Sequence, residues 1–239
     1  MLLRVAGLYR MPASYWIIWA ANRMEQSTLL LMLLPLAVAI SRWRWLTQPL
    51  RVLTIGLVCM AALIALLTFR PLSEGDESLL WHCYTVVQTL FLGSVYYYIF
   101  LQRWQRLGVL FALAAFLVFA LLDWFWLERN QPVHAYTHTL QSTLLLSFGV
   151  LYFYQLARHM PAIRLENDPF FLVTSGIVMY FSGTVLLYVF VLPLIAASDA
   201  LGQHIVSLLV SAVAVLQYTL FALAFYRASR PSSLLLLHE

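Results

Sequence analysis

Apolar residues are grouped along this 239-residue chain in long runs that short polar segments separate. A run of about 20 apolar residues is long enough to cross the hydrocarbon layer of a membrane as a helix. The first run is shorter than the others, because the polar segment SRWRW follows it early. The pattern predicts seven transmembrane helices, over residues 27–40, 52–69, 79–100, 107–126, 136–157, 170–195 and 204–226.

The polar segments between these runs are short and leave no room for a soluble domain of useful size. We therefore expect a single all-α bundle over residues 24–230, followed by a short tail at 231–239. Residues 1–23 precede the bundle and contain the aromatic stretch ASYWIIWAA. Three interpretations of this segment stay open: an interfacial helix, a signal-like segment, or an extension ahead of a start at Met24.

Composition places the chain among integral membrane proteins. Hydrophobic residues make up 63% of the chain and charged residues only 10%, whereas soluble domains carry about 25% charged residues. The lipid bilayer is therefore the expected surrounding of the bundle. All 14 basic residues are arginine, so a retinal Schiff base, which needs a lysine amine, is excluded. We expect Cys59 and Cys83, which lie in or near apolar runs, to fill the core rather than to form a disulfide.

The distribution of arginine predicts the orientation of the bundle. Basic residues in short loops mark the cytoplasmic side of a membrane protein. One side of the predicted bundle has Arg70 and Arg129 with several acidic residues, and residues 1–23 would add Arg4, Arg10 and Arg23 to this side. The other side collects Arg42, Arg44, Arg51, Arg103, Arg106, Arg158, Arg164, Arg227 and Arg230. We predict an outer N-terminus and a cytoplasmic C-terminus in a bacterial inner membrane. Because the arginines lie between apolar runs, they indicate topology and not nucleic-acid binding.

Polar side chains recur at helical spacing on the third, fifth and seventh predicted helices, and Asp123 lies at the outer end of the fourth. Polar faces of membrane helices point toward the bundle interior or a water-filled cavity, because lipid cannot satisfy them. We therefore predict a ligand pocket that opens to the outer side. The predicted lining residues are His82, Thr85, Gln88, Thr89, Tyr96, Asp123, His138, Gln141, His204, Ser207 and Ser211.

Less specific interpretations of the same residues stay open. Histidine is often found among lipid headgroups at the membrane interface, and serine and threonine often only join helices. A zinc site is also possible, because catalytic zinc takes three protein ligands and keeps a position for water. The candidate ligands are His82, His138, His204 and Asp123. In the sixth predicted helix, Asp168 and Pro169 are typical of a helix start.

The chain resembles a group of seven-helix membrane proteins of Bacteroidota that have no established activity. The resemblance rests on His82-Cys83-Tyr84, on LYFYQL at 151–156, on DPFF and SGIVMYFSG within 168–183, and on His204. It covers most of the chain from Met24 onward. The group usually has a glutamate where this chain has Gln88, which puts a charge-dependent role at that position in doubt. Similar proteins occur near signalling genes, which implies a sensory role.

A second resemblance is to zinc-dependent seven-helix membrane hydrolases, such as alkaline ceramidases and adiponectin-receptor-like proteins. Those proteins use three histidines and an aspartate inside the bundle. Their paired histidines lie in the last helix and their site faces the cytoplasm. In this chain the last predicted helix offers only His204, and the polar cluster faces outward, so the chain departs from that pattern.

The function predicted from these observations is that of a receptor-like sensory membrane protein. A small ligand, or a proton taken up by histidine, would act at the outer pocket. A separate cytoplasmic signalling protein would receive the change, since the loops hold no output domain. The first alternative is a zinc-dependent membrane hydrolase that acts on a lipid or a peptide. The second is a transporter or a subunit of a membrane complex.

Overall fold

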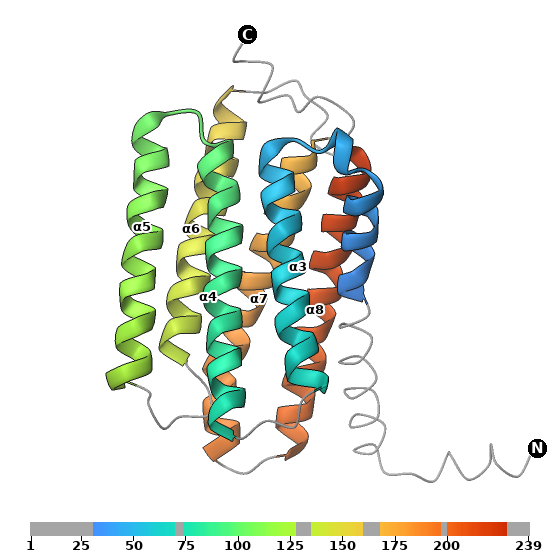
Figure 1. Cartoon of the computed structure of the whole chain (residues 1–239). Coiled ribbons are helices and arrows are strands. Elements are labelled where there is room, and N and C mark those ends of the chain that lie inside the picture. The colour runs from blue at the N-terminus through green and yellow to red at the C-terminus, as the bar shows by residue number, and fades with distance from the viewer. Residues whose placement is uncertain (1–30, 70–73, 128–134, 160–167, 197–199, 229–239) are drawn as a thin grey trace, which may run out of the picture.

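The computed structural model describes residues 31–69, 74–127, 135–159, 168–196 and 200–228, and all regular structure within these ranges is helical (Figure 1). The helices run nearly parallel to one another along the long axis of the molecule. This confirms the predicted all-α fold. The elements are the helix Leu31–Ser41, the short turn η1 (Trp43–Trp45), α3 (Gln48–Phe69), α4 (Glu74–Ile99), α5 (Arg103–Leu122), the widened turn η2 (Asp123–Leu127), α6 (Ala135–His159), α7 (Pro169–Ala196) and α8 (Ala200–Arg227).

Five of the described helices are long and apolar enough to cross a membrane. They cover Gln48–Thr68, Arg103–Trp126, Tyr136–Arg158, Pro169–Leu186 and His204–Arg227. The helix Leu31–Ser41 is shorter, and its predicted beginning at residue 27 lies outside the described residues. Helix α4 has 26 residues but carries many polar side chains, and it is not among the five. The multi-pass membrane fold is thus confirmed, and the count of seven spans stays a prediction.

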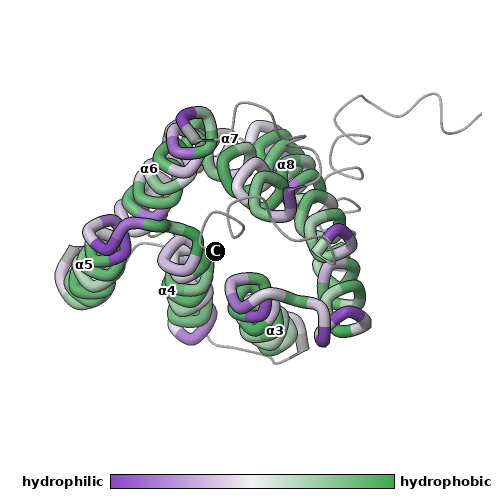
Figure 2. Tube along the Cα trace, turned by 90° about the horizontal axis from the view of Figure 1, so that it is seen from above, coloured by the Kyte–Doolittle hydropathy of each residue, from purple (hydrophilic) through white to green (hydrophobic). Residues whose placement is uncertain are grey.

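Helices that follow one another in sequence pack side by side. Helix α7 contacts α6 on one side and α8 on the other, and α4 contacts α3, α5 and α6. Viewed along the bundle, α5, α6, α7 and α8 form an arc, with α4 and α3 opposite it (Figure 2). Helix α4 therefore lies at the meeting point of three neighbours.

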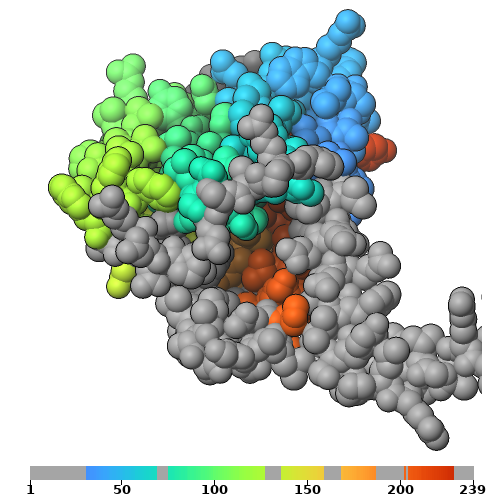
Figure 3. Space-filling view, turned by 60° about the horizontal axis from the view of Figure 1, so that its bottom comes forward, coloured from blue at the N-terminus to red at the C-terminus, as the bar shows by residue number. Residues whose placement is uncertain are grey.

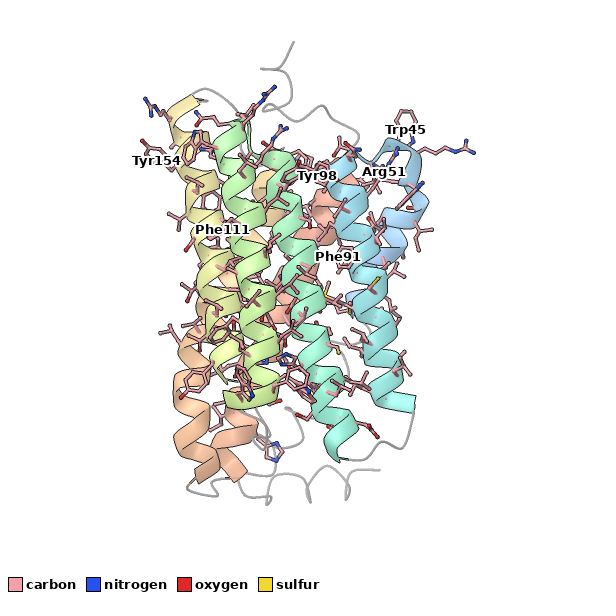
Figure 4. All side chains as sticks on the ribbon, turned by 60° about the vertical axis from the view of Figure 1, so that its left-hand side comes forward. Trp45, Arg51, Phe91, Tyr98, Phe111 and Tyr154 are labelled. Atoms are coloured by element: carbon pink, nitrogen blue, oxygen red, sulfur yellow. The ribbon has the colours of Figure 1, made fainter. Side chains whose placement is uncertain are left out.

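Glycines permit the closest helix contacts. A Cβ atom added to Gly56 on α3 would lie 2.5 Å from the Cβ atom of Phe91 on α4, and Figure 4 shows Phe91 among the tightly packed helices. On α7, a Cβ atom at Gly176 would lie 3.3 Å from Phe221, and one at Gly183 would lie 3.2 Å from Val213, both on α8. The small-residue face of α7 is therefore the face that packs against the last helix, since small residues let backbones approach.

The two ends of the bundle differ in charge. One end, here called the arginine-rich end, carries Arg42, Arg44, Arg51, Arg103, Arg106, Arg158 and Arg227 at or next to the helix ends. Figure 4 labels Arg51 at this end. At this end Arg42 donates a hydrogen bond to the carbonyl oxygen of Tyr226 and lies 4.6 Å from the centre of that tyrosine ring. These contacts join the end of the helix Leu31–Ser41 to the end of α8. The opposite end, here called the acidic end, carries Asp76, Glu77 and Asp123.

Large apolar side chains cover the outside of the bundle. Phe111 on α5 is 78% exposed and Trp126 at the acidic end is 80% exposed; Figure 4 shows Phe111 pointing away from the bundle. Only one narrow stripe of α5 is buried, which consists of Gln105, Val109, Leu113, Phe116 and Ala120. Soluble monomers rarely expose apolar surface of this extent, so the lipid bilayer is the natural surrounding of these faces.

Candidate functional site

The polar face of α4 is buried in the bundle. Four polar side chains of this helix are buried: His82, Thr85, Gln88 and Thr89. The threonine hydroxyls donate to carbonyl oxygens one turn back in the same helix: Thr85 to Trp81 at 3.1 Å and Thr89 to Thr85 at 2.8 Å. Thr89 is satisfied by this bond within α4. The other three side chains make contacts to neighbouring helices.

Two levels of hydrogen bonds join α4 to α6. At the first level, the Nε2 atom of His138 lies 3.4 Å from the hydroxyl oxygen of Thr85. Because that hydroxyl already donates within α4, it accepts from His138. At the second level, one turn further into the bundle, the side-chain amide of Gln141 donates to Gln88 at 3.0 Å and to the carbonyl oxygen of Thr85 at 3.3 Å. The predicted polar faces of these two helices thus meet.

His82 faces α5. Its Nε2 atom lies 3.2 Å from the carbonyl oxygen of Ala120, to which it donates, and its ring centre lies 5.4 Å from that of Trp124. The same carbonyl oxygen accepts from the backbone N–H of Asp123. From Asp123 onward, the helix widens into η2. Widened turns of this kind change the backbone hydrogen-bond register and are frequent at functional sites.

Asp123 connects η2 to the beginning of α6. It is fully buried, and one of its carboxylate oxygens accepts a hydrogen bond from the hydroxyl of Thr137. His138 follows Thr137 directly, so the contact of Asp123 and the contact of Thr85 reach α6 at adjacent residues. The acidic end therefore contains one polar network that joins α4, η2 and α6.

This network consists of two imidazoles, one carboxylate, hydroxyls and amides. An imidazole gains or loses its charge between about pH 5 and 8. Buried ionisable groups in a membrane bundle are costly and mark functional sites by default. Because His82 and His138 are both held by oxygen atoms of a neighbouring helix, a change in their protonation alters contacts between helices. In chemical terms the network can take up a proton or respond to a polar ligand.

A half-open cavity of about 680 Å³ lies beside the network at the acidic end. Figure 3 views the molecule with this end turned toward the reader. The side chain of Trp124 lines the cavity and also contacts the ring of His82. The remaining lining residues are Gly75, Ser78, Leu121, Leu122, Phe125 and Trp126. The cavity is thus an aromatic one next to the network, and its lining differs from the predicted set.

The predicted pocket residues of α8 lie apart from the network. His204 and Ser207 are half-buried and Ser211 is buried, and within the described residues no hydrogen bond joins them to α4 or α6. Helix α8 packs mainly against α7. Tyr218 of α8 forms a side-chain hydrogen bond with Tyr84 of α4.

Tyr96 also lies away from the network, although it is fully buried as predicted. Between its position and the level of Gln88 and Gln141 lie the buried side chains of Leu92 and Leu145. Eight residues of helix separate Gln88 from Tyr96, a rise of about 12 Å. Tyr96 belongs to a second polar region nearer the arginine-rich end.

Sequence reasoning missed three members of the network. Thr137 directly precedes His138, so its position next to a predicted pocket residue could have indicated that it belongs to the network. Trp124 stands directly after Asp123 and offered the same signal. Ala120 takes part through its carbonyl oxygen, and nothing in its side chain could indicate that role.

The predicted zinc ligands are partly brought together. His82, His138 and Asp123 belong to one network, whereas His204 lies on α8. In the part of the chain that the structure describes, no three His, Cys, Asp or Glu side chains are grouped as metal ligands. The Nε2 atoms of His82 and His138 are directed at oxygen atoms of the protein. Zinc binding stays a prediction that metal analysis can test.

Scans against models of protein families, against curated proteins and against solved structures gave no match to this chain.

Proposed function

We propose that this chain is a receptor-like sensory membrane protein, which receives its stimulus at the acidic end. The observation that carries the proposal is the buried network that joins α4, η2 and α6 through His82, Asp123 and His138. Two imidazoles and a carboxylate at one depth would destabilise a bundle with only a structural role, because burial of ionisable groups in a membrane is energetically unfavourable. Sensing makes use of their ability to change charge.

The stimulus is a proton or a small ligand in the aromatic cavity. Trp124 supports this proposal, because it lines the cavity and contacts the ring of His82. A ligand against Trp124 would shift the ring beside His82. Protonation of His82 would change the same contact from the other side. Either event changes the contact between His82 on α4 and Ala120 on α5. The contact of His138 with Thr85 extends the effect to α6.

The response is proposed to leave the bundle at the arginine-rich end. By the positive-inside rule this end is cytoplasmic, so that the N-terminus of a seven-span bundle is outside and the C-terminus is inside a bacterial inner membrane. The short connections at this end offer arginine side chains to a separate signalling protein. Contacts such as that of Arg42 with Tyr226 would be rearranged when the helices shift.

Tryptophan fluorescence of the protein in lipid nanodiscs, recorded from pH 8 to pH 5, tests the proposal. We expect a titration in this range that is lost in His82→Gln, because the glutamine side chain beside Trp124 carries no titratable group. The matched control is His204→Gln, which removes a histidine at the same end but outside the network and keeps the titration. A wild-type signal that is constant over the range, or an unchanged titration in His82→Gln and in His138→Gln, would contradict sensing of protons by this network.

The ligand branch of the proposal needs its own measurement. A panel of small polar and amphipathic compounds is screened by thermal shift at a fixed pH of 8, above the ordinary pKa of a free imidazole. A binder is expected to raise the melting temperature of the wild type and to lose this effect in Trp124→Leu. If neither pH nor any compound produces a response that depends on His82 or Trp124, the sensory function fails.

A further inference from the structure

The aromatic cavity at the acidic end is built from two neighbouring helices. Its walls come from the first turns of α4, from the end of α5 and from the widened turn η2. The turn η2 contributes three consecutive aromatic side chains, those of Trp124, Phe125 and Trp126. The volume of about 680 Å³ lies within the usual range of small-molecule sites. The cavity is therefore large enough to hold an organic ligand.

The cavity borders the lipid-facing surface of the bundle. Helix α5 and η2 form one apolar span over Arg103–Trp126, and α5 lies at one end of the arc of helices (Figure 2). Leu121, Phe125 and Trp126 line the cavity and are also strongly exposed on this span. Exposed apolar side chains of a membrane span contact lipid, and tryptophan is enriched near the headgroups. A ligand therefore reaches the cavity from the lipid phase, at the level of the headgroups.

The surroundings of the cavity favour a positively charged head group. The face of an aromatic ring attracts cations, tryptophan most strongly, and sets of aromatic rings recognise quaternary ammonium ions. Asp76 and Glu77 lie on α4 between two residues that line the cavity, and both side chains are exposed. Within the described ranges this end carries these carboxylates and no arginine, since Arg70 and Arg129 lie outside them. The local charge thus attracts a cation and repels an anion.

We propose that the aromatic cavity binds the quaternary ammonium head of a single-chain amphipath, which enters from the surrounding lipid. The ammonium group lies against the rings of Trp124 and Trp126, and the hydrocarbon chain runs toward the lipid along Leu121 and Leu122, all four of which line the cavity. Each part of the ligand then contacts a matching wall. An anionic or uncharged head on the same chain loses the attraction of the ring faces.

The ligand would act on the sensory network through one side chain. Trp124 contacts the ring of His82, so an ammonium group against Trp124 lies next to the histidine network. The consequence of binding therefore rests on the proposed function. Binding itself requires only the cavity, and it can be measured without any response of His82.

Photolabelling locates the bound ligand in the wild-type protein. The probe is dodecyltrimethylammonium with a photoreactive diazirine in its chain, added to the protein in nanodiscs of phosphatidylglycerol, whose headgroup has no ammonium group. Mass spectrometry identifies the labelled residues. We expect excess unlabelled dodecyltrimethylammonium to abolish labelling of residues 121–126. Labelling of Phe111, an exposed residue of the same helix outside the cavity, should persist as ordinary contact with the lipid phase. Dodecylsulfonate, which has the same chain and an anionic head, should reduce labelling at neither place.

A variant with one aromatic ring fewer tests the contact with the ammonium group. Trp126→Leu should raise the concentration of unlabelled competitor needed for half-maximal loss of labelling about two- to fivefold, because one cation–π contact is lost. Trp126→Phe keeps an aromatic face and should show a smaller increase. The matched control is Trp104→Leu, which removes an exposed tryptophan at the opposite end of the same helix and should leave the concentration unchanged.

Two results would overturn the proposal. The first is labelling of residues 121–126 that excess competitor leaves as high as that of Phe111, which identifies ordinary contact with lipid. The second is equal competition by dodecylsulfonate, which shows that the charge of the head has no role. Both leave the fluorescence titration that depends on His82 untouched. Conversely, loss of that titration together with competed labelling of residues 121–126 would end the sensory proposal and keep the ammonium site.

Discussion

The side-chain amide of Gln141 on α6 donates to the side-chain oxygen of Gln88 on α4 across 3.0 Å, and both residues are buried. The amide of Gln141 also reaches the carbonyl oxygen of Thr85. This pair is the innermost contact of the histidine network between the two helices, because the hydroxyls of Thr89 and Ser142, which follow the two glutamines, bond within their own helices. Neither glutamine carries charge, so the contact is equally present at all pH values at which the protein is folded.

The energy of this pair is expected to be modest and measurable. Replacement of Gln88 or Gln141 by leucine leaves the other amide buried without its partner, so each single variant should be destabilised. In a double-mutant cycle we expect a coupling of about 0.6–1.7 kcal/mol, as for other hydrogen bonds between membrane helices. Unfolding in mixed micelles measures it. The control is Thr143→Val on the exposed face of α6, whose hydroxyl bonds only to its own helix; no coupling between Gln88 and Gln141 would show that the bond is absent.

Close packing of α3 on α4 predicts opposite effects for two glycines. In Gly56→Ala the new methyl group would meet the Cβ atom of Phe91 at 2.5 Å, and overpacking of this kind destabilises by about 1–3 kcal/mol. Gly108 on α5 has no atom within 4 Å of its would-be Cβ atom, so Gly108→Ala should stabilise the helix by about 0.5–1 kcal/mol. The melting temperatures of Gly56→Ala and Gly108→Ala, each compared with that of the wild type, test this prediction. Equal effects at both positions would mean that α3 and α4 are less tightly packed than described.

The proposed orientation predicts which end a membrane-impermeant thiol reagent reaches. In a background without Cys59 and Cys83, Arg103→Cys at the arginine-rich end should be protected in intact cells and labelled after lysis. Gly75→Cys, which lies at the acidic end and is exposed, should be labelled in intact cells. The reverse pattern would place the histidine network on the cytoplasmic side and require a cytoplasmic stimulus.

Chelation is expected to leave the fold unchanged. The Nε2 atoms of both network histidines are already directed at protein oxygen atoms, so the sensory proposal needs no metal to hold His82 and His138. The melting temperature of protein purified without a histidine tag should be the same before and after treatment with a chelator. About one zinc ion per chain by elemental mass spectrometry, lost in His82→Ala with His138→Ala, would support the zinc hydrolase alternative.

The arrangement of α4 and α6 could be predicted from the sequence to a large extent. The stripes that begin at His82 and at His138 each follow one face of a helix, and both are predicted to face the interior because lipid cannot satisfy polar groups. The two faces do meet. Asp168 was expected at the start of a helix, and its carboxylate does cap α7 through the N–H of Phe170. These features depend on local spacing and on burial, which a single sequence contains.

The position of α8 could not be predicted in the same way. The polar stripe that begins at His204 also faces partly inward. Such a stripe indicates that a helix has an inner face, but it does not indicate which helix lies opposite that face. Helix α8 packs on α7, so His204 lies apart from His82 and His138. The widened turn η2 was also missed, since a change of hydrogen-bond register after Ala120 leaves no mark in the pattern of apolar residues.

The low hydropathy of α4 has a consequence for how the protein enters its membrane. Its polar face is satisfied in the bundle by α5 and α6, both of which are synthesised later. A helix with this face would be poorly retained by lipid alone, because isolated polar groups are unfavourable there. Insertion of α4 should therefore depend on its successors, and a chain truncated after Phe100 should integrate this segment less completely than one that continues through α6. The interactions that build the polar network would then also guide the order of membrane assembly.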